Sequence, residues 1–248
     1  MKVSGNKSIY GASVGILMLN ARFPRIPGDM GNALSWPFPV HYKIVAEASP
    51  DRVVRQNAAG LLEKFIEAGQ ELIDRGADGI TTNCGFLALF QKELSQALRV
   101  PVATSSLMQV PLVDSLLPEG KRAGILTISA DTLTPAHLEG AGVKTDTPVF
   151  GTQNGKEFTR AILNNEDTLD IELARQDNVG AALAFLKQYP EIGALVLECT
   201  NMVPYAADIR AATGVPVYSI HSFVSWFQSG LMPPRFPGTL TDARPIRY

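Results

Sequence analysis

Short apolar runs alternate with amphipathic segments along the whole chain. The runs predict strands at 13–19, 39–45, 78–83, 100–104, 122–128, 149–152, 194–197 and 215–220, and the first of these is apolar enough to be buried on both faces. Apolar residues at three- and four-residue spacing predict helices at 61–75, 86–98 and 223–228, and helical segments within 157–189. A further short helix is predicted to end at about residue 117. Strands that alternate with helices form parallel sheets, so the predicted fold class is α/β.

Three features recur in the same order and indicate an internal duplication. Gly-Ile-Leu occurs at 15–17 and again at 124–126. An apolar run then leads to Cys84 in the first copy and to Cys199 in the second, and a Val-Pro-Val follows each cysteine at the same distance. The sequence therefore predicts two pseudo-symmetric α/β domains with parallel sheets. We expect residues 1–112 plus 219–248 to form the first domain and residues 113–218 to form the second.

Both ends of the chain require an interpretation of their own. Met1, Lys2 and Lys7 precede an apolar stretch that resembles a signal peptide, but its match to 122–128 favours a first strand. No apolar run approaches the roughly 18 residues of a membrane span, so we expect no membrane partner. The proline-rich tail from Pro233 is expected to cover part of the surface.

Composition and charge narrow the possible functions. A hydrophobic share of 46% supports a real core, and a net charge of −2 gives no basic surface for nucleic acid. Two cysteines are too few for a disulfide framework, and free thiols suit a cytoplasmic protein. With only three histidines besides, no metal centre is expected.

Polar and sulfur-bearing side chains gather where the predicted strands end. Asn20, Cys84, Thr104, Ser129 and Cys199 all lie at such carboxyl ends. Parallel sheets bind ligands beyond these ends. If the two domains face one another, these residues line one interdomain cleft, and the active site is expected there.

Each cysteine stands at a strand-to-helix junction. A helix N-terminus at this point is expected to lower the thiol pKa and to offer N–H groups to a carboxylate. Two facing thiols could then remove a proton from the carbon beside a carboxylate and return one from the opposite side. The alternative is that Cys84 and Cys199 only fill the core, as free cysteines often do. Their duplicated positions favour the functional interpretation.

Other charged residues have weaker signals. Glu198 is expected to point to the opposite side of the strand from Cys199 and to orient neighbouring groups. Asp29 lies in the irregular segment 21–40 and either stabilises a turn or contacts substrate. Arg22 and Arg25, in the same segment, are expected to be solvated, with a distal substrate carboxylate as the alternative.

At its two cysteine motifs the chain resembles the aspartate/glutamate racemase superfamily. That group includes glutamate, aspartate and hydantoin racemases, maleate isomerase and arylmalonate decarboxylase. The resemblance implies two α/β domains, one cysteine from each at the cleft, a small carboxylic or amino acid substrate, no cofactor, and a homodimer. It implies that Cys84 and Cys199 form the catalytic pair. The substrate-binding residues that it implies or that lie beside the motifs are Asn20, Asn83, Gly85, Thr127, Ser129, Thr200 and Asn201.

The motifs also depart from those of the amino-acid racemases. Those enzymes have Cys-Asn-Thr at the first site and, in glutamate racemases, Cys-Thr-His at the second. Here the first is Cys84-Gly85-Phe86 and the second ends in Asn201, closer to the isomerase and hydantoin branches. The expected function is a cofactor-independent racemase or epimerase of a small carboxylate. A cis–trans isomerase or decarboxylase that uses one cysteine, and a small-acid-binding protein without turnover, remain open.

Overall fold

The computed structural model describes residues 2–236. Its strands are β1 (Val14–Leu19), β2 (Val40–Val45), β3 (Gly79–Thr82), β4 (Val102–Ala103), β5 (Arg122–Thr127), β6 (Val149–Gly151), β7 (Ile192–Leu197) and β8 (Val217–Tyr218). Its α-helices are α1 (Pro50–Val54), α2 (Leu62–Arg75), α3 (Gln91–Leu98), α4 (Val110–Leu116), α5 (Pro135–Gly140), α6 (Phe158–Leu163), α7 (Ile171–Gln188), α8 (Ala206–Thr213) and α9 (Ile220–Leu231). Four 3-10 turns span Ala33–Ser35, Gly85–Phe90, Ser106–Gln109 and Thr200–Tyr205.

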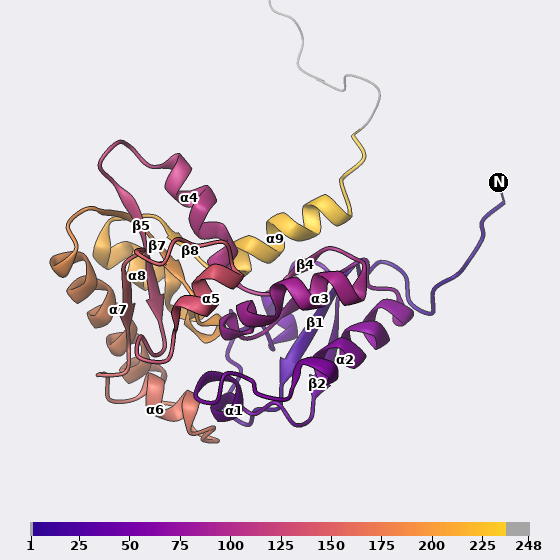
Figure 1. Ribbon diagram of the computed structural model, residues 1–248, viewed down its shortest axis with the longest axis horizontal. Coiled ribbons are helices and arrows are strands. Elements are labelled where there is room, and N and C mark those ends of the chain that lie inside the picture. The colour runs from indigo at the N-terminus through magenta and orange to yellow at the C-terminus, as the bar shows by residue number, and fades with distance from the viewer. Residues whose placement is uncertain (1, 237–248) are drawn as a thin grey trace, which may run out of the picture.

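The strands form two parallel four-stranded sheets with the same internal order. The first sheet runs β2-β1-β3-β4 and the second β6-β5-β7-β8, and the two lie in separate lobes (Figure 1). Gly15 pairs with Ile80 in the first sheet, and Gly124 pairs with Leu195 in the second. Cys84 follows Ile80 at the same distance along the chain as Cys199 follows Leu195. The two cysteines therefore occupy equivalent positions in the two sheets. The predicted α/β fold with two pseudo-symmetric parallel sheets is confirmed.

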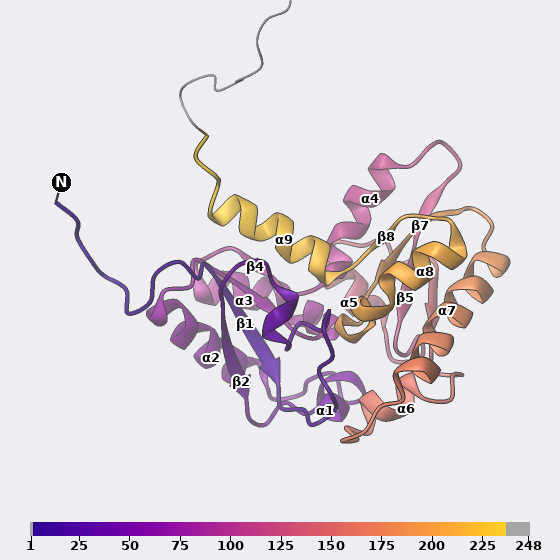
Figure 2. The same ribbon diagram turned by 180° about the vertical axis from the view of Figure 1, so that it is seen from behind.

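Side-chain alternation along β1 explains how its sheet is covered on both faces. Leu17 and Leu19 belong to the large core that α2 covers, whereas Val14, Ile16 and Met18 point to the other face. Helix α9 packs on that second face through residues such as Phe223 and Val224. It follows β8 of the second sheet and returns to the first lobe (Figure 2). The domain boundaries, including the assignment of 219–248 to the first domain, stay a prediction.

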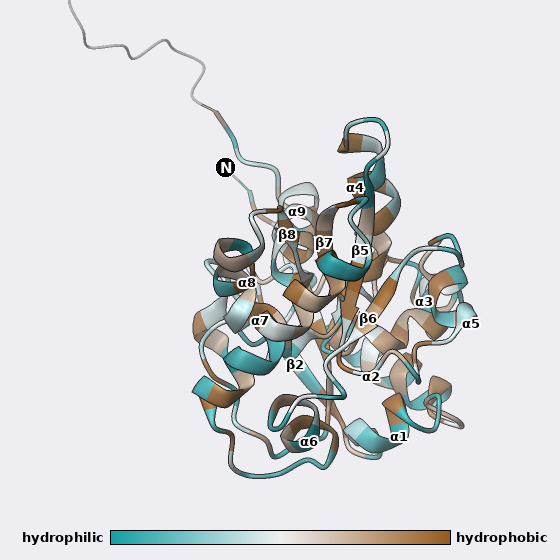
Figure 3. Ribbon diagram, turned by 90° about the vertical axis from the view of Figure 1, so that its left-hand side faces the viewer, coloured by the Kyte–Doolittle hydropathy of each residue, from teal (hydrophilic) through white to brown (hydrophobic). Residues whose placement is uncertain are grey.

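Apolar character is concentrated inside the lobes. In the second sheet, β5 and β7 are buried along almost their whole length, and the apolar colouring of Figure 3 follows these strands. None of the helices within residues 2–236 combines the length and apolar character that crossing a membrane requires.

The structure changes several predicted boundaries. The strand expected at 215–220 is only Val217–Tyr218, because Ser219 forms a capping box that starts α9 at Ile220. Gly76 ends α2 with a φ of 124°, as expected of a helix-ending glycine. The helix expected at 86–98 begins with a 3-10 turn and becomes α-helical only at Gln91. The first strand is confirmed as β1, while most of the tail expected to cover the surface, 237–248, lies outside the described residues.

Gly15 and Gly124 occupy equivalent places where a strand touches the helix above it. A Cβ at Gly15 would lie 2.8 Å from Ile80 and 3.1 Å from Leu72, and one at Gly124 would lie 2.6 Å from Ile192. Gly15→Ala and Gly124→Ala are each expected to lower the free energy of unfolding by about 1–3 kcal/mol, because the added methyl overpacks the core. Denaturant unfolding of the purified variants measures this.

Gly180→Ala is the matched control for these two variants. This glycine lies inside α7, and a Cβ there would meet nothing within 4 Å. Alanine is therefore expected to leave stability unchanged or to raise it by about 0.5–1 kcal/mol. Equal effects of all three substitutions would contradict the packing described above.

Candidate functional site

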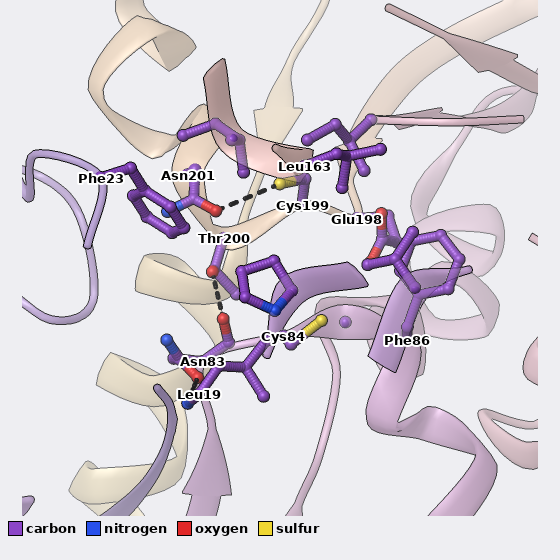
Figure 4. Close-up of a pocket in the computed structure, with 15 residues that line it drawn as sticks. Leu19, Phe23, Asn83, Cys84, Phe86, Leu163, Glu198, Cys199, Thr200 and Asn201 are labelled. Atoms are coloured by element: carbon purple, nitrogen blue, oxygen red, sulfur yellow. Dashed lines mark hydrogen bonds between the residues drawn. The ribbon is translucent and has the colours of Figure 1, made fainter. Parts of the chain in front are cut away.

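A cavity lies where the carboxyl ends of the two sheets meet. It encloses about 350 Å³ of atom-free space, part of it open to solvent. Both cysteines line it (Figure 4). The other lining residues come from both sheets and from the covering helices α1 and α6: Leu19, Phe23, Pro50, Val54, Asn83, Gly85, Phe86, Ile128, Ile162, Leu163, Glu198, Thr200 and Asn201.

Cys84 follows β3 in a turn that hydrogen bonds connect to the neighbouring strands. The Asn83 side chain accepts a hydrogen bond from the Leu19 N–H at 2.7 Å, which fixes the end of β3 against the end of β1. The Thr82 hydroxyl donates to the Thr104 carbonyl at 2.6 Å on the other side. Cys84 itself has an extended backbone and precedes the 3-10 turn Gly85–Phe90. Its position is therefore set by three neighbouring strands.

Cys199 follows β7 and is connected to the first lobe through two polar side chains. Its Sγ lies 3.6 Å from the Asn201 Oδ1, with the thiol as donor. The Asn201 amide donates in turn to Asp29, which is buried and forms a 3.0 Å ion pair with Arg25. Asp29 also accepts from the Gly31 N–H at 2.7 Å. Asp29 thus stabilises a turn, which was one of the two roles expected from the sequence. It also holds the Asn201 side chain in place.

The expectation of lowered thiol pKa values is wrong. Burial raises the pKa of Cys84 above its ordinary value, and the nearby Glu198 carboxylate raises it further. Burial and Glu198 raise the pKa of Cys199 in the same way. The N–H groups of Phe86 and Asn201 act in the opposite direction but do not prevail. The turns after both cysteines are short 3-10 segments, so their end dipoles cannot offset the loss of water.

Glu198 is the residue that the sequence interpretation misplaced. It lines the cavity together with Cys199 instead of pointing to the other side of the strand. The reason is that β7 ends at Leu197, before Glu198 and Cys199, so the strict alternation of a strand does not have to continue through these two residues. Burial raises the pKa of Glu198 to about 7. The only sequence feature that pointed to a place for Glu198 in the cavity was its position directly before Cys199.

The remaining predicted site residues separate into two groups. Asn83, Gly85, Thr200 and Asn201 line the cavity. Thr127 lies one layer behind it and donates to Glu198 at 2.6 Å. Ser129 and Asn20 are not among the lining residues, and the exposed Asn20 donates to the Ala46 carbonyl at 2.9 Å.

Charged side chains of other kinds are arranged away from the cavity. Arg25 lies with its guanidinium 4.5 Å from the centre of the Phe23 ring and is not a lining residue itself. Within residues 2–236 no three His, Cys, Asp or Glu side chains form a group that could hold a metal ion. The lining residues include two thiols and one carboxyl group but no Lys or Arg.

Comparison with known proteins places this chain in a family. A dimethylsulfoniopropionate lyase from Durusdinium sp. clade D is 30% identical over 238 residues, which span 92% of this chain and 78% of the relative. Dimethylsulfoniopropionate lyase 7 from Emiliania huxleyi is 28% identical over 236 residues, 90% of this chain and 69% of the relative. No family model matches the chain.

Solved structures of the racemase superfamily share the fold. A glutamate racemase from Bacillus anthracis superposes with a TM-score of 0.60 at 17% identity, over 89% of this chain and 81% of its own. A glycine-to-cysteine variant of arylmalonate decarboxylase gives a TM-score of 0.59 at 15% identity, over 88% of this chain and 92% of its own.

The superfamily expected from the two cysteine motifs is thus confirmed. The expectation of a racemase has support only from the fold, because the sequence relatives named above are lyases. With 30% identity across most of both chains, this chain belongs to the dimethylsulfoniopropionate lyase family, within the aspartate/glutamate racemase superfamily.

Proposed function

We propose that this protein is a lyase that removes the proton beside the carboxylate of a small acid and expels the substituent on the next carbon. The observation that carries the proposal is the cavity lined by Cys84 and Cys199, one from each sheet. The relatives' names supply the first substrate to test, dimethylsulfoniopropionate. In the proposed reaction, a cysteine side chain acts as the general acid or base.

The reaction balances without a further reactant. The C–H bond beside the carboxylate breaks, and its electron pair forms the new carbon–carbon double bond. The bond between the next carbon and the positively charged sulfur breaks, and its pair leaves with sulfur as dimethyl sulfide. The organic product is acrylate, and the proton goes to the thiolate that served as base. The second thiol lies on the other side of the cavity, where it could return a proton in a reversible or non-eliminating reaction.

Residues beside the thiols are the candidates for holding the substrate. Asn83, Gly85, Thr200 and Asn201 line the cavity next to the cysteines. The side chains of Asn83 and Asn201 already have partners within the protein, at Leu19 and Asp29. We therefore assign them mainly to shaping the site. The homodimer and the cytoplasmic location expected from the sequence remain predictions.

A racemase or epimerase is the second candidate, and the presence of two thiols favours it. A single base suffices for elimination, whereas inversion at carbon needs a proton donor on the opposite face. Racemases of glutamate, aspartate and allantoin are among the fold neighbours. Incubation in D₂O separates the candidates: elimination releases acrylate, and racemisation inverts an amino acid while deuterium enters at its α-carbon.

Cys84→Ser and Cys199→Ser test the assignment of the site. At least one of them is expected to lower the rate of dimethylsulfoniopropionate cleavage by roughly 10²–10⁴-fold, because a serine hydroxyl is a far weaker base than a thiolate. Dimethyl sulfide in the headspace and acrylate in solution measure the rate. Both variants are nearly isosteric with the parent, and unchanged thermal unfolding would show that each folds. Full activity in both variants would exclude the cysteines as the reacting groups.

The activity is also expected to depend on pH in a defined direction. The thiolate is the active base, and burial with the Glu198 charge raises both thiol pKa values. The fraction of thiolate therefore grows as pH rises, and kcat/KM for dimethylsulfoniopropionate is expected to increase steadily between about pH 7 and pH 9. A pH–rate profile measures this. A profile that is already flat from about pH 6 upward would contradict a raised thiol pKa.

A further inference from the structure

Glu198 brings a carboxyl group into the cavity with one oxygen unpartnered. The side chain is fully buried, and its Oε2 accepts a 2.6 Å hydrogen bond from the Thr127 hydroxyl. Its Oε1 has no hydrogen-bond partner among the described residues. An unpaired buried oxygen of this kind is costly unless a ligand supplies the partner.

The backbone around Glu198 is shaped to keep this oxygen in place. A Cβ at Gly85 would collide with Oε1 and with the Glu198 carbonyl, so only glycine leaves room for the carboxyl group. The Phe86 ring lies on the same side of the cavity as the carboxyl group (Figure 4). An aromatic ring beside a carboxylate is the combination that proteins use to bind onium cations.

The charge of the cavity points to the same ligand. Its ionisable lining groups are Cys84, Cys199 and Glu198, and all three are neutral or negative. A thiolate and a substrate carboxylate add negative charge, which burial makes unfavourable without a compensating cation. No Lys or Arg lines the cavity, and the nearby Arg25, whose charge acts to lower the pKa of Cys84, is already paired with Asp29. A cation on the substrate would therefore supply the compensating charge inside the cavity.

We infer that Glu198 is the residue that selects substrates with a positively charged substituent, by pairing its free Oε1 with a sulfonium or quaternary ammonium group beside Phe86. The inference rests on the proposed function, whose test substrate carries a carboxylate at one end and a sulfonium group at the other. What it adds is the residue that recognises the cationic end. Burial raises the pKa of Glu198 to about 7, and an adjacent cation would favour the ionised form.

Two ligands of the same shape test this without requiring turnover. 3-(Trimethylammonio)propionate carries a cation, and 4,4-dimethylpentanoate replaces the nitrogen by carbon and is otherwise identical in outline. Isothermal titration of the protein at pH 8 is expected to show at least about tenfold tighter binding of the cationic ligand. In Glu198→Gln, which keeps the side-chain shape and can still accept from Thr127, this preference is expected to disappear.

The variant is expected to fold at least as stably as the parent protein at this pH. The carboxyl group titrates near 4.5 when unfolded and near 7 when buried, so its stabilising contribution is lost as pH rises between these values. Above pH 7 the buried charge destabilises the fold, and glutamine removes that charge. Glu191→Gln, immediately before the first residue of β7, is the matched control and is expected to keep the cation preference.

The outcomes separate this inference from the proposed function. If the parent protein binds both ligands equally, or if Glu198→Gln keeps the preference, Glu198 acts as a neutral hydrogen-bonding group and the inference is wrong, whether or not dimethylsulfoniopropionate is cleaved. If the preference is present and depends on Glu198 while no dimethyl sulfide is released, the inference stands and the proposed lyase activity fails.

Discussion

A single buried hydrogen bond joins the two cysteine-bearing turns. The Thr200 hydroxyl donates to the Asn83 carbonyl at 2.6 Å, so the residue after one cysteine holds the residue before the other. Ser106 makes a second connection between the lobes by donating to the Leu197 carbonyl at 2.6 Å. Both contacts are buried, where a lost partner costs most. Together with the Asn201–Asp29 contact, these two bonds hold the cysteine-bearing turns of the two lobes against each other.

The duplicated architecture explains why two such turns meet. The central strands are β1 and β3 in the first sheet and β5 and β7 in the second. Cys84 follows β3, and Cys199 follows β7. Parallel strands present all their carboxyl ends at one edge. When two similar sheets place these edges against each other, one chain provides two chemically similar groups on opposite sides of one cavity. Such an arrangement suits the transfer of a proton to or from a single carbon.

The sequence was sufficient for the fold class, the parallel sheets and the pairing of Cys84 with Cys199, because these depend on apolar periodicity and on a repeated motif. It could not place Glu198, since the direction of that side chain depends on where β7 stops. Nor could it show that Asp29 holds Asn201, because 172 residues separate the two along the chain. The predicted lowering of the thiol pKa values was wrong for a related reason. A sequence indicates the helix that follows a cysteine, but it does not show that the cysteine is buried away from water.

Both sulfur atoms are expected to contact the same small ligand. Treatment with 1,3-dibromoacetone, a short reagent with two alkylating ends, tests this most directly. We predict a digest in which one peptide pair carries Cys84 and Cys199 joined by a single three-carbon bridge, and slower bridging when 3-(trimethylammonio)propionate is bound. Two cysteines that are alkylated separately, each by its own reagent molecule and without protection by the ligand, would contradict a shared site.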